Sequence, residues 1–504
     1  MSLHRRRVLG GAVAAVLAGV GAAAGRGPDY GALARGIDGR LVLPADGDYP
    51  EARQLFQPRY DAVAPAAVAY PAHVGDVAVC LDFARRSGTP VVPRGGGHGY
   101  AGWSTRAAAL VIDTGAMAAV EVEGDGVRIG AGARLGDVHS ALAGRGLAVP
   151  TGLCPSVGIA GLTLGGGLGP ASRAHGTTAD RLIGARVVTP DGAVREVSTD
   201  RDPQLYWALR GGGGGNFGIV TELRLRTHRA DDCAFAELHW PEADSAAVLR
   251  GWQRWLGALP DPFWSQVEFT AEAGAAAGPP AVRVACLDGR GELERQLTRL
   301  SDLVGPPLRD SWVVVRGWGE TARALSGCAD LTAEQCRLPG TLPGRGPRGL
   351  LERSSYAARS DFWAGPGLPD AAVRAVLAGV RRYAASVPPG GRGVVQFDGV
   401  CGGAVNRVPA AATAFVHRDS AFLAQYLAYW PESAPAAEVA RHQGWLDGLW
   451  QDLRPWATGR AYQNYADPKL VGWREAYYGP NLARLEEVRR TYDPDRLFRF
   501  PQAL

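Results

Sequence analysis

Three glycine-rich loops constrain the fold of this chain more than any other feature. They cover residues 94–99, 152–169 and 211–218, and each lies beside a short apolar segment. Because glycine has no Cβ, several N–H groups of such a loop can converge on one anion, and the backbone can adopt positive φ. The spacings of the P-loop and of the Rossmann fingerprint are both missing. The loops therefore indicate either a nucleotide-binding fold of another kind or tight turns in a glycine-rich chain.

The first two loops each carry one reactive side chain. His98 lies in the sequence Arg-Gly-Gly-Gly-His-Gly, and Cys154 lies in Gly-Leu-Cys-Pro-Ser-Val-Gly. A histidine and a cysteine on loops open enough for a phosphate or an aromatic ring indicate a cofactor held at two points. The competing interpretation is a histidine in a polar turn and a small buried cysteine.

Charge and cysteine usage argue against two kinds of site. The net charge is +4 over 504 residues and no basic cluster is interleaved with aromatics, so nucleic acid is not an expected partner. None of the seven cysteines forms a Cys-x-x-Cys pair, and we expect no metal. Cys328 and Cys336 are near enough in sequence to form a disulfide, which an exported protein would permit.

Residues 1–25 are expected to be an export signal. Arginines at positions 5–7 precede an apolar, alanine-rich stretch over residues 8–24 that ends in small residues. The adjacent arginines favour the twin-arginine export machinery, with an ordinary Sec signal or an uncleaved anchor as the alternative. No other segment is long and apolar enough to span a bilayer, so we predict a secreted protein without a stable membrane anchor.

The pattern of apolar residues after the signal predicts an α+β fold. Residues up to about 60 read as an irregular lead-in. Over residues 63–230 the pattern predicts helices at 76–86, 135–143 and 204–209, strands at 90–93, 110–113 and 219–227, and hairpins at 124–126 and 191–192. Residues 231–455 predict an antiparallel sheet with helices on one face, including strands at 312–315, 394–397 and 414–416. Residues 456–504 are turn-rich and end in a helix over 481–492.

Longer motifs around the loops resemble one known family. The segments 91–98, 154–169 and 211–220 resemble the three flavin loops of the berberine-bridge-enzyme-like oxidases, which belong to the vanillyl-alcohol-oxidase type of flavoproteins. The segments 462–465 and 492–498 resemble the C-terminal region of that family. The resemblance implies a PCMH-type FAD-binding domain of two subdomains (63–230), a substrate-binding domain (231–455) and a C-terminal segment (456–504) that completes the FAD domain.

The same resemblance implies that FAD is attached to the protein twice. Family members link a histidine to the 8α carbon of the isoalloxazine and a cysteine to C6, and the matching residues here are His98 and Cys154. Two such links are expected to raise the redox potential of the flavin. The residues expected to bind FAD are Arg94, Gly95, Gly96, Gly97, His98, Gly99, Cys154, Val157, Gly158, Gly161, Gly165, Gly166, Asn216, Phe217, Gly218, Ile219, Val220 and Asn464.

The implied chemistry is removal of hydride from a hydroxyl-bearing carbon while a base takes the hydroxyl proton. Tyr462 is the expected base. Because the reference pKa of tyrosine is ~10, it needs a neighbouring donor or cation, and Tyr465 or Gln396 could contribute. The alternative for each residue is a buried aromatic ring or amide with a satisfied hydrogen bond.

Two departures from the family pattern affect the expected substrate. Many relatives have a second active-site tyrosine where His175 stands here, so His175 either replaces it as a proton partner or shapes the pocket. The glutamate base of the plant alkaloid enzyme has no counterpart at residues 400–403. Oxidation of an alcohol or a saccharide is therefore expected rather than alkaloid ring closure.

Val157 bears on the electron acceptor. In the family, the side chain three residues after the flavin cysteine controls access of oxygen, and valine accompanies oxygen reactivity. We therefore predict a secreted oxidase that acts on a sugar, a glycoside or a secondary metabolite and uses O2, with release of H2O2. The alternatives are a flavin-binding protein with little turnover and a dehydrogenase with a non-oxygen acceptor. The export signal and Cys154 argue against a reductase of nucleotide-sugar synthesis.

Overall fold

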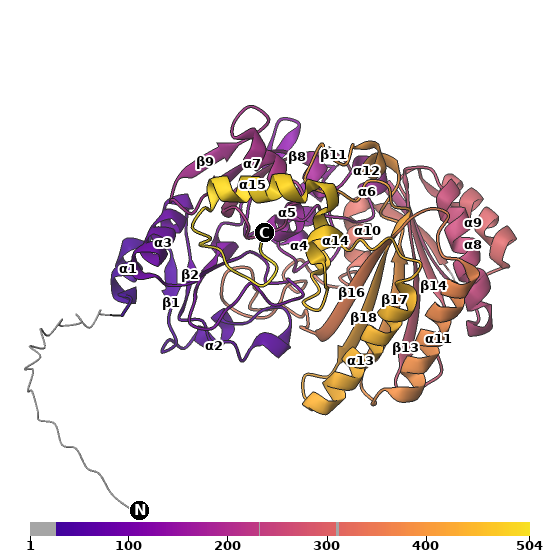
Figure 1. Ribbon diagram of the computed structural model, residues 1–504. Coiled ribbons are helices and arrows are strands. Elements are labelled where there is room, and N and C mark those ends of the chain that lie inside the picture. The colour runs from indigo at the N-terminus through magenta and orange to yellow at the C-terminus, as the bar shows by residue number, and fades with distance from the viewer. Residues whose placement is uncertain (1–26, 231, 309–311) are drawn as a thin grey trace, which may run out of the picture.

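The structure, a computed structural model, describes residues 27–230, 232–308 and 312–504. The expected export signal lies outside these residues. Within them, no helix combines the length and the apolar character needed to cross a bilayer. The mixed α+β class predicted from the sequence is confirmed, with several sheets and many short helices (Figure 1).

The first sheet has four strands in the order β1-β2-β4-β3, and β2, β3 and β4 run parallel. The elements of this region are α1 (Tyr30–Gly36), β1 (Arg40–Val42), α2 (Tyr49–Ala52), β2 (Ala67–Tyr70), α3 (Val74–Ser87), β3 (Val91–Arg94) and β4 (Leu110–Asp113). The expectation of an irregular lead-in is wrong, because β1 pairs with β2 and α1 packs on α3.

The helix α3 also begins earlier than predicted. The side chain of His73, and not that of Asp76, accepts the capping hydrogen bond, from the N–H of Gly75. Asp76 instead accepts the N–H groups of Ala72, Asp38 and Gly39, which joins the helix to the chain before β1.

The second sheet has five antiparallel strands in the order β5-β6-β10-β8-β9, and the third glycine loop leads directly into its central strand, β10. Its region comprises β5 (Val120–Glu123), β6 (Gly126–Gly130), α4 (Leu135–Ala143), β7 (Leu147–Ala148), α5 (Ile159–Leu164), α6 (Ser172–His175), β8 (Leu182–Val188), β9 (Val194–Val197), α7 (Pro203–Ala208), β10 (Ile219–Arg226) and β11 (His228–Arg229). Both predicted hairpins are present, as β5–β6 and β8–β9.

The third sheet has seven antiparallel strands in the order β15-β12-β14-β13-β17-β18-β16. Its strands are β12 (Asp232–His239), β13 (Phe263–Glu272), β14 (Ala281–Cys286), β15 (Trp312–Gly317), β16 (Ser355–Trp363), β17 (Arg392–Asp398) and β18 (Phe422–Trp430). The helices of this region are α8 (Ser245–Ala258), α9 (Arg290–Val304), α10 (Trp318–Leu325), α11 (Asp370–Ser386), α12 (Gly403–Arg407) and α13 (Ala436–Leu453). The predicted strand over 414–416 is wrong, because this segment is irregular and buried against the glycine loops.

The alternation of residues along β17 explains how this sheet forms a site. Val395 and Phe397 belong to the apolar core between the sheet and the helices α8, α9, α11 and α13. Because successive residues of a strand point to opposite faces, Gln396 and Asp398 lie on the other face, toward the glycine loops. The helices therefore cover one face of the sheet (Figure 1) and leave a polar face free for a site.

The C-terminal segment returns to the first half of the molecule, as α14 (Trp473–Tyr478) and α15 (Leu482–Tyr492), drawn in yellow in Figure 1. Leu485 and Val488 share a core with Leu205 of α7. The buried side chain of Arg489 donates to the Oδ1 of Asn216 at 3.2 Å, which joins α15 to the third glycine loop.

The predicted disulfide between Cys328 and Cys336 is present. It closes a short loop after α10, and the segment that follows packs on the first half of the chain. There the N–H of Leu342 donates to the Oε1 of Glu51 at 2.8 Å.

Candidate active site

A cavity of about 740 Å³ lies between the three glycine loops and the polar face of the seven-stranded sheet. Its lining includes residues 94–99, 213–216 and 218–220 from two of the loops. From the second loop it includes Cys154, Val157 and Gly161, and from the C-terminal segment it includes residues 462–466. One cavity therefore collects the segments that the sequence motifs singled out.

His98 and Cys154 face each other across the hydroxyl of Ser156. The Nε2 of His98 lies 2.9 Å from the Ser156 Oγ, and the Cys154 Sγ lies 3.6 Å from the same oxygen. The imidazole also stacks on Phe56, with ring centroids 4.0 Å apart. The two reactive side chains, 56 positions apart in sequence, are thus held at one end of the cavity. Because the Nε2 of His98 contacts Ser156, Nδ1 is the imidazole nitrogen that this contact leaves unengaged.

The environment keeps His98 neutral. Burial, together with the nearby charge of Arg134, lowers the pKa of His98 to about 3. A neutral imidazole has a free lone pair and can act as a nucleophile. Burial raises the pKa of the Cys154 thiol, while hydrogen bonds from Ser156 and Val157 lower it.

The glycine loops form a cradle that suits a flat ring and a phosphate chain. Gly96 and Gly158 lie backbone to backbone, and a Cβ on either one would overlap the other. At Gly161, by contrast, a Cβ would meet nothing within 4 Å, so this backbone is open to the cavity. Backbone N–H groups that no side chain covers can bind phosphate oxygens, and the residues present therefore fit FAD.

Most of the predicted cofactor residues line the cavity, and four predicted site residues do not. Gly165, Gly166 and Phe217 are packing positions: a Cβ on Gly165 would overlap Asn464, one on Gly166 would overlap Phe415, and Phe217 is buried in the core. His175 lies outside the cavity lining and stacks on His228 with ring centroids 3.7 Å apart. Its position does not support the expectation that it replaces an active-site tyrosine.

Arg94 contributes backbone rather than side chain to this cavity wall. Its Nε donates to Asp113 and its Nη2 donates to the carbonyl of Ala52 at 2.7 Å. Both contacts lie behind the loop, so the guanidinium group supports the loop from its far side.

A chain of amides and a phenol crosses the polar face of the sheet. Gln396 donates from Nε2 to the Oε1 of Gln425 at 2.8 Å, and Gln425 donates to the hydroxyl of Tyr100 at 2.7 Å. Tyr100 in turn stacks on Tyr465, with ring centroids 5.1 Å apart and planes 5° apart. The expected place of Gln396 at the cavity is therefore observed, and it is joined to a tyrosine of the first glycine loop.

Asp398, which sequence reasoning missed, also lies in this cavity. Burial raises the pKa of its carboxyl to about 7, and a hydrogen bond from the Nε1 of Trp264, at 2.6 Å, opposes the shift. Burial raises the pKa of the nearby Tyr465 phenol, and the charges of Tyr100 and of Asp398 raise it further. The signal that could have found Asp398 is the alternation in β17, where it follows Gln396 by two residues on the same face.

The two C-terminal tyrosines have different environments. The hydroxyl of Tyr462 accepts the N–H of Gly167 at 3.0 Å and the Nδ2–H of Asn464 at 2.9 Å. Tyr465 packs against Tyr462 with ring centroids 5.0 Å apart, and it faces Tyr100 and the carboxylate of Asp398. Burial raises the pKa of both phenols, so both are neutral near pH 7.

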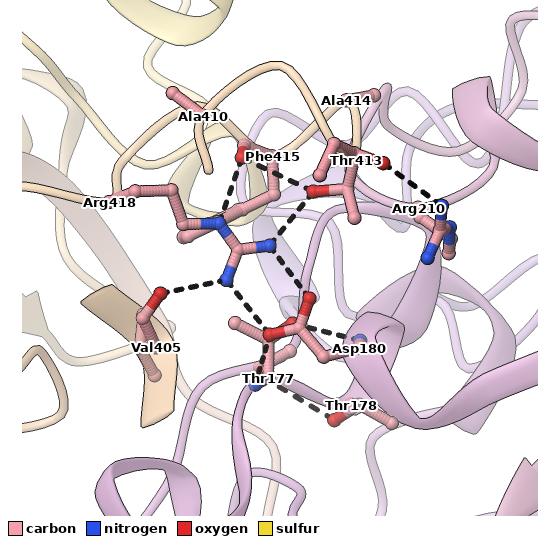
Figure 2. A network of polar contacts seen from close by, with 12 residues as sticks. Thr177, Thr178, Asp180, Arg210, Val405, Ala410, Thr413, Ala414, Phe415 and Arg418 are labelled. Atoms are coloured by element: carbon pink, nitrogen blue, oxygen red, sulfur yellow. Dashed lines mark hydrogen bonds and ion pairs between the residues drawn. The ribbon is translucent and has the colours of Figure 1, made fainter. Parts of the chain in front are cut away.

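A buried ion pair supports the second glycine loop from outside the cavity. Figure 2 shows the guanidinium of Arg418 bonded to both carboxylate oxygens of Asp180, at 2.7 and 2.8 Å, and to the carbonyl of Phe415. The ring of Phe415 lies against Gly166, and the backbone of Phe415 lies against Gly211. The segment 413–418 thus connects the sheet domain to two glycine loops, and Arg418 holds it there.

Comparisons with known proteins agree with this site. Residues 65–198 match the family model described as FAD binding domain, and residues 461–504 match the model described as berberine and berberine like. The uncharacterized FAD-linked oxidoreductase YgaK of Bacillus subtilis is 31% identical over 93% of this chain and 97% of its own length. The chitooligosaccharide oxidase of Gibberella zeae is 30% identical over 87% of each chain.

A solved structure of the glucooligosaccharide oxidase from Acremonium strictum, whose FAD is 6-S-cysteinyl and 8α-N1-histidyl, superimposes with a TM-score of 0.81. It is 25% identical and covers 93% of this chain and 97% of its own. The fold and the site thus define an FAD-linked oxidoreductase. The chain belongs to the berberine-bridge-enzyme-like family of these enzymes.

Proposed function

We propose that this enzyme oxidises a hydroxyl-bearing carbon of a saccharide, with O2 as the electron acceptor and H2O2 as the second product. The observation that carries the proposal is that His98, Cys154 and Asp398 line one cavity. The wall of this cavity opposite the glycine loops is polar. The similarity to a chitooligosaccharide oxidase and a glucooligosaccharide oxidase supports a sugar as substrate.

FAD is held in this proposal by bonds to both His98 and Cys154. Three observations support the two links: the side chains share Ser156 as a neighbour, the imidazole is neutral, and the related glucooligosaccharide oxidase carries both links. When bound, the flavin supplies the acceptor for the hydride that leaves the substrate carbon.

In this proposal, residues of the chain bind the substrate hydroxyl and accept its proton. Asp398 is the base to which the proton of the substrate hydroxyl finally moves, because a carboxylate with a pKa of about 7 can accept and release a proton near neutral pH. Tyr465 bonds the substrate hydroxyl as a neutral phenol, since burial, and after it the charges of Tyr100 and Asp398, raise the pKa of its phenol. Tyr462, whose hydroxyl is already engaged by Gly167 and Asn464, positions the second glycine loop.

The far wall of the cavity suits a sugar chemically. Gln396 and Gln425 present amides, and Tyr356 and Tyr429 add aromatic rings 5.3 Å apart. Sugar rings offer hydroxyls to amides and C–H faces to aromatic rings. Glu268 and Arg283, 3.5 Å apart, add a charged pair that can bond several hydroxyls at once.

A panel of mono- and oligosaccharides and simple alcohols, assayed for peroxide release by the purified yellow protein, tests the proposal. We expect release with at least one saccharide and bleaching of the flavin by that sugar under anaerobic conditions. Bleaching without rapid reoxidation in air would indicate a dehydrogenase with another acceptor. If no member of the panel bleaches the flavin, saccharide oxidation is wrong, and a flavin-binding protein with little turnover becomes the better interpretation.

We also propose that the protein is exported by the twin-arginine machinery and that residues 1–25 are removed. The arginines at positions 5–7 and the apolar stretch after them support this. Replacing residues 5 and 6 by Lys should abolish export of the folded protein, which fractionation of producing cells measures. Export that continues unchanged would contradict the twin-arginine route.

A further inference from the structure

A second, smaller cavity lies behind the first glycine loop. Its volume is about 30 Å³, and residues 94–97 separate it from the flavin cavity, since they line both. The other walls come from residues 51, 52 and 54–56, and from 338 and 343–345 in the segment after the disulfide. The loop that is expected to carry the flavin therefore has an internal cavity at its back.

The charges around this cavity do not balance. Its charged lining residues are Arg94, Arg134, Arg345, Asp113 and Glu51, which make three cations and two anions. Arg94 pairs with Asp113, and the Nε of Arg345 lies 3.6 Å from Glu51. No ion pair of Arg134 occurs among residues 27–230, 232–308 and 312–504, which leaves one cation without a counter-charge.

The acid that follows Arg134 on α4 does not supply this counter-charge. Asp137 already accepts two hydrogen bonds from Arg337, from Nε at 3.1 Å and from Nη2 at 2.5 Å. Asp137 is also absent from the lining of the small cavity. Tyr70, which does line it, is neutral because burial raises the pKa of its phenol to about 12.

Two guanidinium nitrogens are also unpartnered. The Nη1 atoms of Arg94 and Arg134 are buried and have no hydrogen-bond partner in the described part of the chain. The two residues are only 4% and 8% exposed. A buried N–H without a partner destabilises the folded state, and more so when it carries charge, so a ligand that accepts both groups would stabilise the fold.

The size and lining of the cavity restrict that ligand. A site needs about 10–15 Å³ to hold one water molecule, so this one has room for a single-atom ion or about two waters, and none for a phosphate or a carboxylate. Leu55, Phe56 and Pro343 give it a partly apolar wall, which suits a weakly hydrated ion. Gly344 packs against the guanidinium of Arg134, where a Cβ would overlap it, and closes the cavity on the side of the disulfide segment.

We propose that this cavity binds a monovalent halide, chloride under physiological conditions, between the guanidinium groups of Arg94 and Arg134. The ion supplies the missing negative charge and accepts the two unpartnered N–H groups. It also ties residues 343–345 to the back of the first glycine loop. This site does not depend on the identity of the sugar or of the electron acceptor.

The consequence for the flavin site follows from the position of Arg134. Its charge contributes to the low pKa of His98, after the larger effect of burial. A bound halide offsets part of that charge. Halide binding is therefore expected to raise the pKa of His98 from its lowered value, although the ion does not enter the flavin cavity.

Crystals of the holoenzyme soaked in bromide test the proposal directly. We expect an anomalous peak within hydrogen-bond distance of both Nη1 atoms. A cavity that holds only water molecules after the soak overturns the proposal, and this readout needs no variant.

A titration in solution gives the second readout. At constant ionic strength, replacement of gluconate by chloride or bromide should raise the Tm of the holoenzyme in a saturable way. Arg134→Met should abolish the saturable rise. Arg86→Met, which removes an exposed arginine on α3, should retain the saturable rise.

If wild type melts at one temperature in gluconate, chloride and bromide, the proposal is wrong. A saturable rise that persists in Arg134→Met would place the halide elsewhere and would also overturn it.

Discussion

The hydroxyl of Tyr462 accepts the backbone N–H of Gly167 at 3.0 Å, and this bond joins positions 295 residues apart in the chain. It ties the C-terminal segment to the second glycine loop, which gives the hydroxyl of Tyr462 a structural role there. Tyr465, three residues later, instead faces Tyr100 and Asp398.

The two tyrosines are therefore expected to respond differently to loss of the hydroxyl. Tyr465→Phe should lower kcat by about 10²–10⁴-fold, as for loss of a group that acts on the reacting proton. Tyr462→Phe leaves the N–H of Gly167 unpartnered and should cost about 1–3 kcal/mol of stability, with kcat within about tenfold of wild type. Steady-state peroxide assays and thermal melts measure both. A larger loss of kcat in Tyr462→Phe than in Tyr465→Phe would restore Tyr462 as the base.

Asp398 predicts the pH dependence of the reaction. The pKa of this carboxyl is about 7, and only its ionised form can accept a proton, so kcat/KM should rise with pH below about 7 and level off above it. Asp398→Asn should lower kcat/KM by about 10²–10⁴-fold and abolish this limb of the profile.

Asp361 offers a matched control for that prediction. Burial raises the pKa of the Asp361 carboxyl to about 7 as well. Asp361 differs from Asp398 because it pairs with Arg454 at 3.0 Å and lies outside the cavity lining. Asp361→Asn should keep the rising limb of kcat/KM even where the protein becomes less stable. A rising limb that survives in Asp398→Asn and disappears in Asp361→Asn would show that the wrong carboxylate has been assigned.

The attachment of the flavin can be tested by denaturation. His98→Ala and Cys154→Ala should each retain flavin fluorescence on a denaturing gel, since one bond remains, whereas the double variant should release all of it. Ser156→Ala removes the neighbour shared by the two side chains and should slow attachment without preventing it. Complete release of the flavin by either single variant would mean that only one covalent bond is formed.

Some features could be predicted because short stretches of the sequence indicate them: the glycine loops, the two reactive side chains and the α+β class. Asp398 was not found because the Asp-Gly pair it forms with Gly399 is also typical of an ordinary turn, and its place at the cavity depends on how β17 pairs with its neighbours. The segment 414–416 was mistaken for a strand because its apolar residues are buried, although they pack on glycine loops and pair with no strand. His175 lies outside the cavity lining, and its position could not be predicted because a family position says little about where a side chain points.

The ion pair of Arg418 with Asp180 is expected to contribute strongly to stability. The two side chains are 3% and 10% exposed, and loss of one partner leaves the other charge buried (Figure 2). Arg418→Met should therefore lower the unfolding free energy by about 3–5 kcal/mol. Arg407, in the same region, pairs with Asp261 at the surface, and Arg407→Met should cost no more than about 1 kcal/mol. Equal losses in the two variants, measured by denaturant unfolding of the holoenzyme, would contradict the role given to Arg418.

Val157 lines the cavity, as do Cys154 and the open backbone of Gly161, and we expect its size to control the access of oxygen. Val157→Leu adds one methylene group at this point, and we expect reoxidation of the reduced flavin by O2 to slow by about tenfold or more, the size of effect that one methylene has on a fitted pocket. Anaerobic reduction by substrate should stay near its wild-type rate, because in the proposed reaction the substrate lies against the face of the sheet that carries Gln396 and Asp398. Stopped-flow measurement of the two half-reactions separates these effects. Equal slowing of both half-reactions would show that Val157 shapes the substrate pocket rather than the path of oxygen.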